Sequence, residues 1–258
     1  MNLERIEYSA ATDVGARWSN QDNFMVDQEP AYDGTQAALA LSGTLDASRT
    51  RLLCVCDGVG GAYMGDMAAR LTIEAVAEAA QLPENRTLPL PQLLEAAAEA
   101  AQQRVTAFYD AEGLPGGCTL ALLGLQGDAW AFLNIGDSPA FLLRETEGLR
   151  ELSTRHNLAW EKLRRGELPG RNDSCRLLHY MGKPFFRARE MAAVTQGTLR
   201  DGDCFLLCSD GITNSIGPEE LCRELQRGTD AAELVRRAAR APGADNCTAI
   251  CLTVRTGT

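Results

Sequence analysis

Three apolar runs in this chain end abruptly in an aspartate, and this repeated feature constrains the fold more than any other. The runs are Leu52 to Asp57, Ala131 to Asp137 and Phe205 to Asp210, and Asp245 comes just before the last apolar run. Short apolar or β-branched runs predict strands. Because adjacent antiparallel strands bring such ends together at one edge, we expect these carboxylates to gather there. They would repel one another unless a cation neutralised them.

The residue types in this pattern indicate which cation would bind. Oxygen ligands without His or Cys suit hard cations, which are magnesium, manganese and calcium. A zinc site is a poor alternative, because the only histidines are His156 and His179 and no CxxC pair exists. For any single Asp-Gly, the alternative is an ordinary turn after a strand. The set of aspartates taken together favours a metal site.

Composition bounds the class of protein. Apolar residues make up 45% of the 258 residues and charged residues 23%, which predicts a packed fold. We expect a single domain over residues 1–258. The net charge of −10 argues against a nucleic-acid partner, which needs a basic surface. No run of eighteen apolar residues exists, so we expect no membrane partner either.

Nine cysteines raise the question of disulfides. Six of them form pairs spaced two or four residues apart in apolar runs, which places each pair on one face of a strand: Cys54 and Cys56, Cys204 and Cys208, Cys247 and Cys251. We interpret them as thiols of the core. The chain begins without a basic segment or an apolar signal core, so we expect the reducing cytoplasm as its location.

Periodicity predicts a mixture of strands and helices. Strands are expected at Leu52 to Cys56, Thr119 to Leu125, Ala129 to Ile135, Ala140 to Leu143, Cys204 to Cys208 and Cys247 to Val254. Amphipathic helices are expected at Gly65 to Ala80, Pro91 to Tyr109, Pro218 to Gln226 and Ala231 to Ala241. Gln126-Gly127-Asp128 predicts a hairpin. Tyr32 to Arg51 indicates a loop or irregular hairpin, and His156 to Lys183 a mobile excursion.

The motifs match a known family when they are taken in order. The run from Thr12 to Phe24 resembles the opening motif of bacterial protein phosphatase 2C enzymes. Five further matches follow in the family's order: Asp57-Gly58-Val59-Gly60-Gly61, Gly117-Cys118-Thr119, Gly136-Asp137-Ser138, Ser209-Asp210-Gly211 and Asp245-Asn246. Each motif is weak alone, but the ordered series spans nearly the whole chain. The resemblance implies an α+β fold, a four-layer α/β/β/α sandwich with two central, mostly antiparallel sheets.

The resemblance also implies roles for single residues. Asp57 would bridge two divalent cations, manganese or magnesium, and most other protein ligand positions would be filled by the Gly58 carbonyl, Asp22, Asp210 and Asp245. Four aspartates against two divalent ions leave the site nearly neutral before phosphate arrives. A water that bridges both ions would lose a proton readily and could attack phosphorus. The implied reaction is hydrolysis of phosphoserine and phosphothreonine in proteins, without a covalent phospho-enzyme.

Four further assignments follow from the same resemblance. Arg17 stands where the family holds the substrate phosphate, and a guanidinium suits this task because its fork donates two parallel hydrogen bonds. The alternative for Arg17 is an ordinary surface arginine. Asp137, with Asp210, resembles the pair that binds a weaker third metal ion. Residues 156–183 correspond to the family's variable flap, and the implied partners are phosphoproteins that a serine/threonine kinase produces.

Four positions depart from the family pattern. Gln21 stands where the family usually has a glutamate, Ala62 where many members have a histidine that protonates the leaving oxygen, Pro139 where an arginine is frequent, and Asn214 where an aspartate often supports the third metal. These substitutions leave an alternative function open, a degenerate phosphatase domain that binds a phosphoprotein without hydrolysing it. An unrelated metal-dependent phosphoesterase for small molecules is a third possibility, and the motif order disfavours it.

Overall fold

The computed structural model describes residues 3–30, 38–46, 48–59 and 64–256. Within these ranges twelve strands form two six-stranded sheets, and all neighbouring strands pair antiparallel. The β1 sheet has the order β4 (Ala38–Leu45), β1 (Leu3–Asp13), β12 (Cys247–Thr256), β11 (Cys204–Cys208), β8 (Ala140–Arg144) and β9 (Gly148–Glu151). The β5 sheet has the order β10 (Ala193–Thr198), β7 (Ala129–Ile135), β6 (Leu120–Gln126), β5 (Arg51–Asp57), β2 (Asp22–Val26) and β3 (Glu29–Pro30).

Side-chain alternation along the strands explains why the two sheets stack. In β5, Leu53 and Val55 belong to the apolar cluster between the sheets, whereas Cys54 and Cys56 belong to the cluster on the opposite face. The other two predicted cysteine pairs, in β11 and β12, likewise share the outer face of the β1 sheet. Because successive strand residues point to opposite faces, each sheet needs a cover on both sides. These six cysteines are free and pack in or against these clusters, as predicted.

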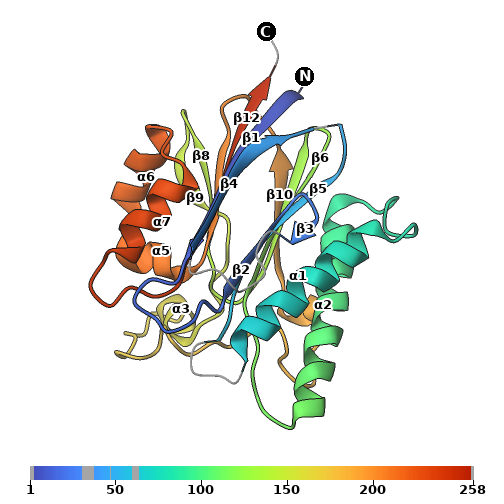
Figure 1. Ribbon diagram of the computed structural model, residues 1–258, viewed down its shortest axis with the longest axis vertical. Coiled ribbons are helices and arrows are strands. Elements are labelled where there is room, and N and C mark those ends of the chain that lie inside the picture. The colour runs from blue at the N-terminus through green and yellow to red at the C-terminus, as the bar shows by residue number, and fades with distance from the viewer. Residues whose placement is uncertain (1–2, 31–37, 47, 60–63, 257–258) are drawn as a thin grey trace.

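Helices supply the two outer covers (Figure 1). The β5 sheet is covered by α1 (Gly65–Gln81), α2 (Leu90–Glu112) and the short α4 (Ala188–Met191). The β1 sheet is covered by α5 (Asp210–Ser215), α6 (Pro218–Gln226) and α7 (Ala231–Ala239). The layers therefore follow the order helix, sheet, sheet, helix, which confirms the expected four-layer α+β sandwich. The hairpin at Gly127 also forms, between β6 and β7, with a positive φ at the glycine.

One predicted region is wrong in kind. The expected loop or irregular hairpin from Tyr32 to Arg51 contains β4, a regular strand that pairs with Ile6–Asp13 of β1 over eight residues. Most of β4 is exposed on the edge of its sheet, so it lacks the alternation of buried residues that predicts a strand. Residues Ala38–Leu45 nevertheless form a strand, because they pair with β1 along their whole length. Residues 32–37 of the region lie outside the described residues.

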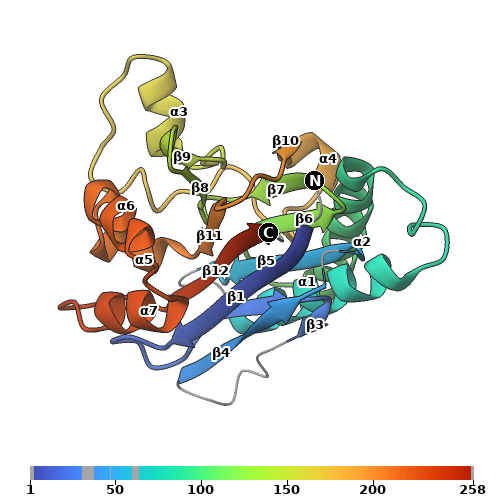
Figure 2. The same ribbon diagram turned by 90° about the horizontal axis from the view of Figure 1, so that it is seen from above.

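The segment from His156 to Lys183 is largely irregular and carries the short helix α3 (Leu158–Arg164). In Figure 2 α3 stands apart from the layer formed by α1 and α2. Backbone hydrogen bonds nevertheless join the start of the segment to its later part. Leu158 N donates to Arg176 O at 2.9 Å, and Leu178 N donates to His156 O at 2.7 Å. The segment is thus an ordered excursion, and its mobility stays a prediction. Among the helices of the described chain, none combines the length and the apolar character needed to cross a membrane.

Candidate active site

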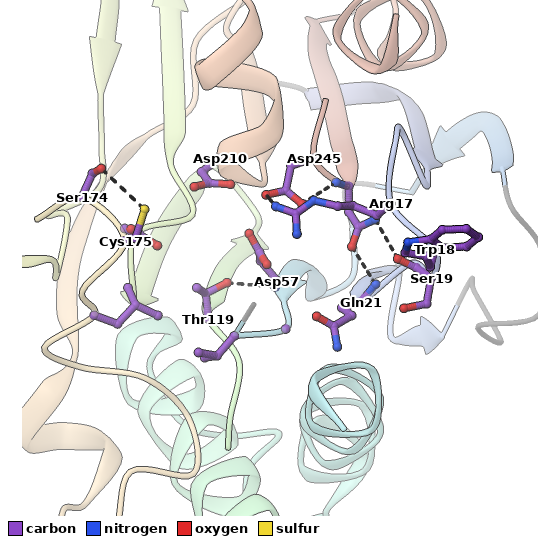
Figure 3. Close-up of a pocket in the computed structure, with 15 residues that line it drawn as sticks. Arg17, Trp18, Ser19, Gln21, Asp57, Thr119, Ser174, Cys175, Asp210 and Asp245 are labelled. Carbon is purple, nitrogen blue, oxygen red and sulfur yellow. Dashed lines mark hydrogen bonds and ion pairs between the residues drawn. The ribbon is translucent and has the colours of Figure 1, made fainter. Parts of the chain in front are cut away.

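Four of the aspartates singled out in the sequence line one cavity of about 540 Å³. They are Asp57, Asp137, Asp210 and Asp245. Figure 3 shows three of them around the same space, with Arg17 beside Asp245 and Cys175 on the opposite side. In the β5 sheet, Asp57 is the last residue of β5 and Asp137 lies just after β7, whereas Asp210 and Asp245 flank strands of the β1 sheet. The sequence alone suggested that the carboxylates meet along one edge of a single sheet. In the structure they meet between the two sheets.

Asp22 lies behind the cavity wall. It is the first residue of β2 and stands directly opposite Asp57 in the pairing of β2 with β5. Its side chain is buried, and Oδ2 accepts a hydrogen bond of 2.6 Å from Ser209 Oγ. Oδ1 is buried and has no hydrogen-bond partner among the described residues. A buried carboxylate oxygen without a partner is costly, so Oδ1 fits a position that a cation or its water would satisfy.

A hydroxyl chain fixes the backbone of Asp57. Its N–H donates to Thr119 Oγ1 at 2.9 Å, and Thr119 N donates back to Asp57 O at 2.8 Å. Thr119 Oγ1 and Ser138 Oγ share a further hydrogen bond of 2.5 Å inside the protein. These contacts leave the carboxylate of Asp57 free to face the cavity. The end of β5 is thus locked in place by residues of the two motifs that follow it.

The carboxylates raise one another's pKa in this arrangement. Burial is the main cause of the raised pKa of Asp22, to about 7, and hydrogen bonds from Ser209 and Thr248 oppose it. Burial followed by repulsion from Asp22 and Asp210 holds the pKa of Asp57 well above its usual range. Burial with repulsion from Asp137 and Asp245 raises the pKa of Asp210 to about 6. A cluster of carboxylates with raised pKa values binds protons or metal cations readily, because either one removes the repulsion between the negative charges.

Arg17 contacts a carboxylate in this structure. Its Nη2 donates to Asp245 Oδ2 at 2.7 Å, and both side chains are partly exposed at the cavity. The loop that carries Arg17 is held by Asn246, whose Nδ2 donates to the carbonyls of Val14 and Ser19 at 2.9 and 3.0 Å. Asn246 Oδ1 also accepts a hydrogen bond of 2.9 Å from Gln21 N. One side chain thereby holds three backbone positions of the opening motif.

Two glycines allow the chain segments of the site to approach closely. A Cβ at Gly58 would lie 2.6 Å from the backbone carbon of Gly65, the first residue of α1. A Cβ at Gly211 would lie 2.0 Å from the carbonyl oxygen of Asn246. Both distances are shorter than any side chain tolerates, so the Asp-Gly pairs at 57–58 and 210–211 do more than make turns. They let the chain approach the start of α1 next to Asp57 and approach Asn246 next to Asp210.

The positions that depart from the family pattern fall in different places. Gln21 lines the cavity. Asn214 hydrogen-bonds to the carboxylate of Asp210, which lowers the pKa of that group against the larger effect of burial. Pro139 contributes its carbonyl, which accepts a hydrogen bond of 3.0 Å from Cys208 N. Ala62, where many members of the family have a histidine, lies outside the described residues.

Sequence reasoning missed the polar residues that hold the aspartates. In the sequence, Ser209 and Asn246 stand out only as neighbours of aspartates, and Thr119 only as the start of a strand. Asn157, whose Nδ2 donates to Asp137 Oδ2 at 2.9 Å, had no assigned role. Ser209, Asn246 and Thr119 belong to the motifs themselves, so a serine, threonine or asparagine within a motif was the available signal. No local signal pointed to Asn157, which lies twenty residues from its partner.

Comparison with known proteins identifies the family. The model of the protein phosphatase 2C family matches residues 38–246, which is more than half of the chain. The serine/threonine protein phosphatase PstP of Mycobacterium tuberculosis is 28% identical over 208 residues, covering 78% of this chain and 40% of that protein. The serine/threonine phosphatase stp of Listeria monocytogenes is 27% identical over 219 residues, covering 77% of this chain and 82% of that protein.

The fold comparison gives the same result. The crystal structure of the catalytic domain of the serine threonine protein phosphatase PstP in complex with two manganese ions superposes with a TM-score of 0.76 at 26% identity. The superposition covers 97% of this chain and 99% of that one. The chain thus spans less than half of the curated mycobacterial relative but nearly all of its crystallised catalytic domain. On these matches, the chain belongs to the protein phosphatase 2C family.

Proposed function

We propose that the chain hydrolyses phosphoserine and phosphothreonine in proteins, with two divalent cations held between its two sheets. The observation that carries this proposal is the cavity in which Asp57, Asp210 and Asp245 meet beside Arg17. Three independent chain segments converge there on oxygen ligands and one guanidinium, which together suit a metal-assisted phosphoryl transfer. The names of the Mycobacterium and Listeria relatives support a phosphoprotein as the substrate.

The donor set fits manganese or magnesium. The carboxylates, the carbonyl of Gly58 and the unpartnered Oδ1 of Asp22 are all oxygen donors. Among the residues that the structure describes, no three acidic, His or Cys side chains converge tightly enough to hold an ion alone. Water would therefore complete the coordination, as magnesium commonly requires. The manganese ions of the PstP structure support two ions, and Asp137 with Asp210 stays our proposal for a weaker third.

The cations and the protein have separate tasks in this proposal. When bound, the cations would lower the pKa of a water between them, which then attacks phosphorus in line. Arg17 would exchange its ion pair with Asp245 for a bidentate contact to the substrate phosphate. Asn246 would hold the Arg17 loop at the right place for this exchange. The excursion at 156–183, which contributes Cys175 to the cavity wall, would act as the flap over the substrate.

We also propose that the substrates come from a serine/threonine kinase and that the chain works in the cytoplasm, as one domain. The free state of its nine cysteines supports a reducing compartment. A second candidate function is non-catalytic binding of a phosphoprotein. The specific observation that favours it is Gln21, a neutral amide in the cavity wall where a carboxylate would strengthen cation binding.

Phosphate release from phosphothreonine peptides, with and without manganese, tests the proposal. We expect release only with the cation, and nearly none from the Asp57→Asn and Asp210→Asn variants. Asp128→Asn is the matched control, because Asp128 is an exposed carboxylate in the hairpin between β6 and β7. Equal release in chelator would overturn the metal assignment. Faster release from nucleotides than from peptides would favour a small-molecule phosphoesterase.

A further inference from the structure

An exposed tryptophan stands at the mouth of the cavity. Trp18 is fully exposed, yet it lines the same cavity as the carboxylates. Phe185 is also fully exposed but does not line this cavity. Leaving an indole in water forgoes the favourable burial of one of the largest apolar side chains. A large aromatic exposed at a binding cavity is typical of a contact residue for a partner.

The backbone on both sides of Trp18 is fixed. Asn246 holds the carbonyls of Val14 and Ser19, and Ala16 N donates to Ala244 O at 3.0 Å. Asn246 is itself buried. The loop therefore presents the indole from a defined position, so a ligand that covers it pays little ordering entropy for the backbone. This is the arrangement expected of a preformed backbone that presents a side chain to a partner.

The position of Trp18 relative to Arg17 sets which part of a substrate it meets. The two residues are adjacent, with Cα atoms about 3.8 Å apart. In Figure 3 the Arg17 side chain lies toward Asp245 and the Trp18 ring lies on the outer side, away from Asp57. A phosphate that contacts Arg17 therefore places the peptide residues next to the phosphorylated one within reach of the indole. An extended chain advances about 3.3 Å per residue, so two residues on either side of the phosphorylated one reach up to about 7 Å from it, and this is the range that we assign to the indole.

We propose that Trp18 is a specificity-determining residue, which selects phosphoproteins with an apolar side chain within two residues of the phosphorylated serine or threonine. The inference rests on the proposed function, because it uses Arg17 as the phosphate contact. The apolar Val59 and Leu177 also line the cavity, so the substrate meets further apolar surface beyond the indole. When an apolar side chain of the substrate covers Trp18, the side chain and the indole both leave water, and this burial lowers KM.

Matched phosphothreonine peptides test the inference. They differ only in carrying Phe or Ser at one of the four positions within two residues of the phosphothreonine. For each peptide, kcat/KM with manganese is divided by kcat/KM for p-nitrophenyl phosphate, which has no flanking residues. We expect the wild type to prefer Phe at one position at least by about tenfold. Trp18→Ala should reduce this preference to near one, whereas Trp18→Phe should keep most of it.

Phe185→Ala is the matched control, because it removes an equally exposed aromatic away from the cavity. It should keep the full preference. A second measurement does not need turnover. Tryptophan emission is followed while a Phe-containing peptide with a nonhydrolysable phosphonate is added in magnesium. We expect a blue shift in the wild type, since the indole leaves water, and none in Trp18→Phe.

The outcomes separate the two proposals. If p-nitrophenyl phosphate and peptides are not hydrolysed at all, the proposed function fails, and the emission shift alone decides whether Trp18 contacts a phosphopeptide. If they are hydrolysed but no flanking Phe is preferred, Trp18 is no specificity residue. An equal loss of preference in Phe185→Ala would likewise overturn the inference, because the effect would then not belong to the cavity.

Discussion

Asn157 Nδ2 donates a hydrogen bond of 2.9 Å to Asp137 Oδ2, while Asn157 Oδ1 accepts one of 3.0 Å from Trp160 N. One side chain thus joins a carboxylate of the cavity wall to the first turn of α3, where it serves as the N-cap. Since α3 belongs to the segment at 156–183, a change at Asp137 is transmitted directly to the proposed flap.

The first prediction concerns this link. Asn157→Ala removes both the cap and the partner of Asp137, whereas Asn157→Asp keeps a capping oxygen and replaces the donor with a charge. Loss of a cap costs about 1 kcal/mol. We expect the amides of α3 to exchange hydrogen roughly fivefold faster in Asn157→Ala and to stay protected in Asn157→Asp. Exchange measured by mass spectrometry checks this, and identical rates in all three proteins would contradict the capping role.

The second prediction concerns Arg17. Arg17→Ala should raise KM for phosphopeptides and leave manganese binding almost intact, because we propose that the guanidinium contacts phosphate and not the ions. Arg17→Lys retains the charge but loses the two parallel donors, so it should recover only part of the affinity. KM and a manganese titration are measured on the same preparations. An unchanged KM in Arg17→Ala would make Arg17 an ordinary surface residue.

The third prediction concerns the stability of the metal-free protein. The raised pKa values of Asp22, about 7, and Asp210, about 6, mean that the folded chain binds more protons than the unfolded chain above the usual value of 3.8. Their contribution is therefore complete below pH 4 and is lost as pH rises toward 7. We expect the free energy of unfolding to fall by a few kcal/mol in total between pH 5 and 7.5, because each of the two groups contributes roughly 1 to 3 kcal/mol over this range.

Asp22→Asn isolates the effect. His156, whose pKa is lowered to about 4 by burial, acts in the opposite direction, because its contribution is present above pH 6.5 and is lost toward pH 4. It is common to both proteins and cancels in the comparison. The unfolding free energy of Asp22→Asn should depend less steeply on pH, and added manganese should restore stability to the wild type at pH 7.5. Equal pH slopes would remove Asp22 from the set of coupled carboxylates.

Six strands (β5, β6, β7, β8, β11 and β12) and four helices (α1, α2, α6 and α7) were predictable, because their periodicity reflects burial on one face or on both. Strands β1 and β2 also contribute to the core but were not among the expected strands. In β5, the unbroken apolar run from Leu52 to Cys56 matches a strand with a layer on each side. Strand β4 was not predictable, because an exposed edge strand carries no such pattern and depends on β1 for its conformation. The layer order came only from the resemblance to a known family.

The site was predictable at its aspartates and not at their supports. An aspartate after an apolar run is visible in sequence, but Asp22 faces Asp57 only through the pairing of β2 with β5. The contact of Asn157 with Asp137 likewise depends on how the 156–183 segment returns to the cavity. The ion pair between Arg17 and Asp245 joins residues at the two ends of the chain. Such long-range contacts leave no local signal.

The last prediction concerns Gln21, whose side chain lines the cavity and whose N–H is held by Asn246. Gln21→Glu adds one negative charge next to the proposed cations. At about 4 Å and an effective dielectric constant near 20, this charge is worth on the order of 4 kcal/mol per unit of cation charge before desolvation. We therefore expect a lower manganese requirement, measured by calorimetry and by activity against manganese concentration. Gln196→Glu, an exposed substitution in β10, controls for the change in net charge.

Two results would contradict this expectation in different ways. If the wild type already binds two ions tightly and Gln21→Glu binds no better, the charge at position 21 has no role in cation binding. The amide oxygen of Gln21 would then already do what the carboxylate does in related phosphatases. If neither protein binds two ions nor releases phosphate, while both still bind a phosphoprotein, the non-catalytic function becomes the better one. In that case Gln21 marks the loss of catalysis in a cavity that retains its phosphate contact at Arg17.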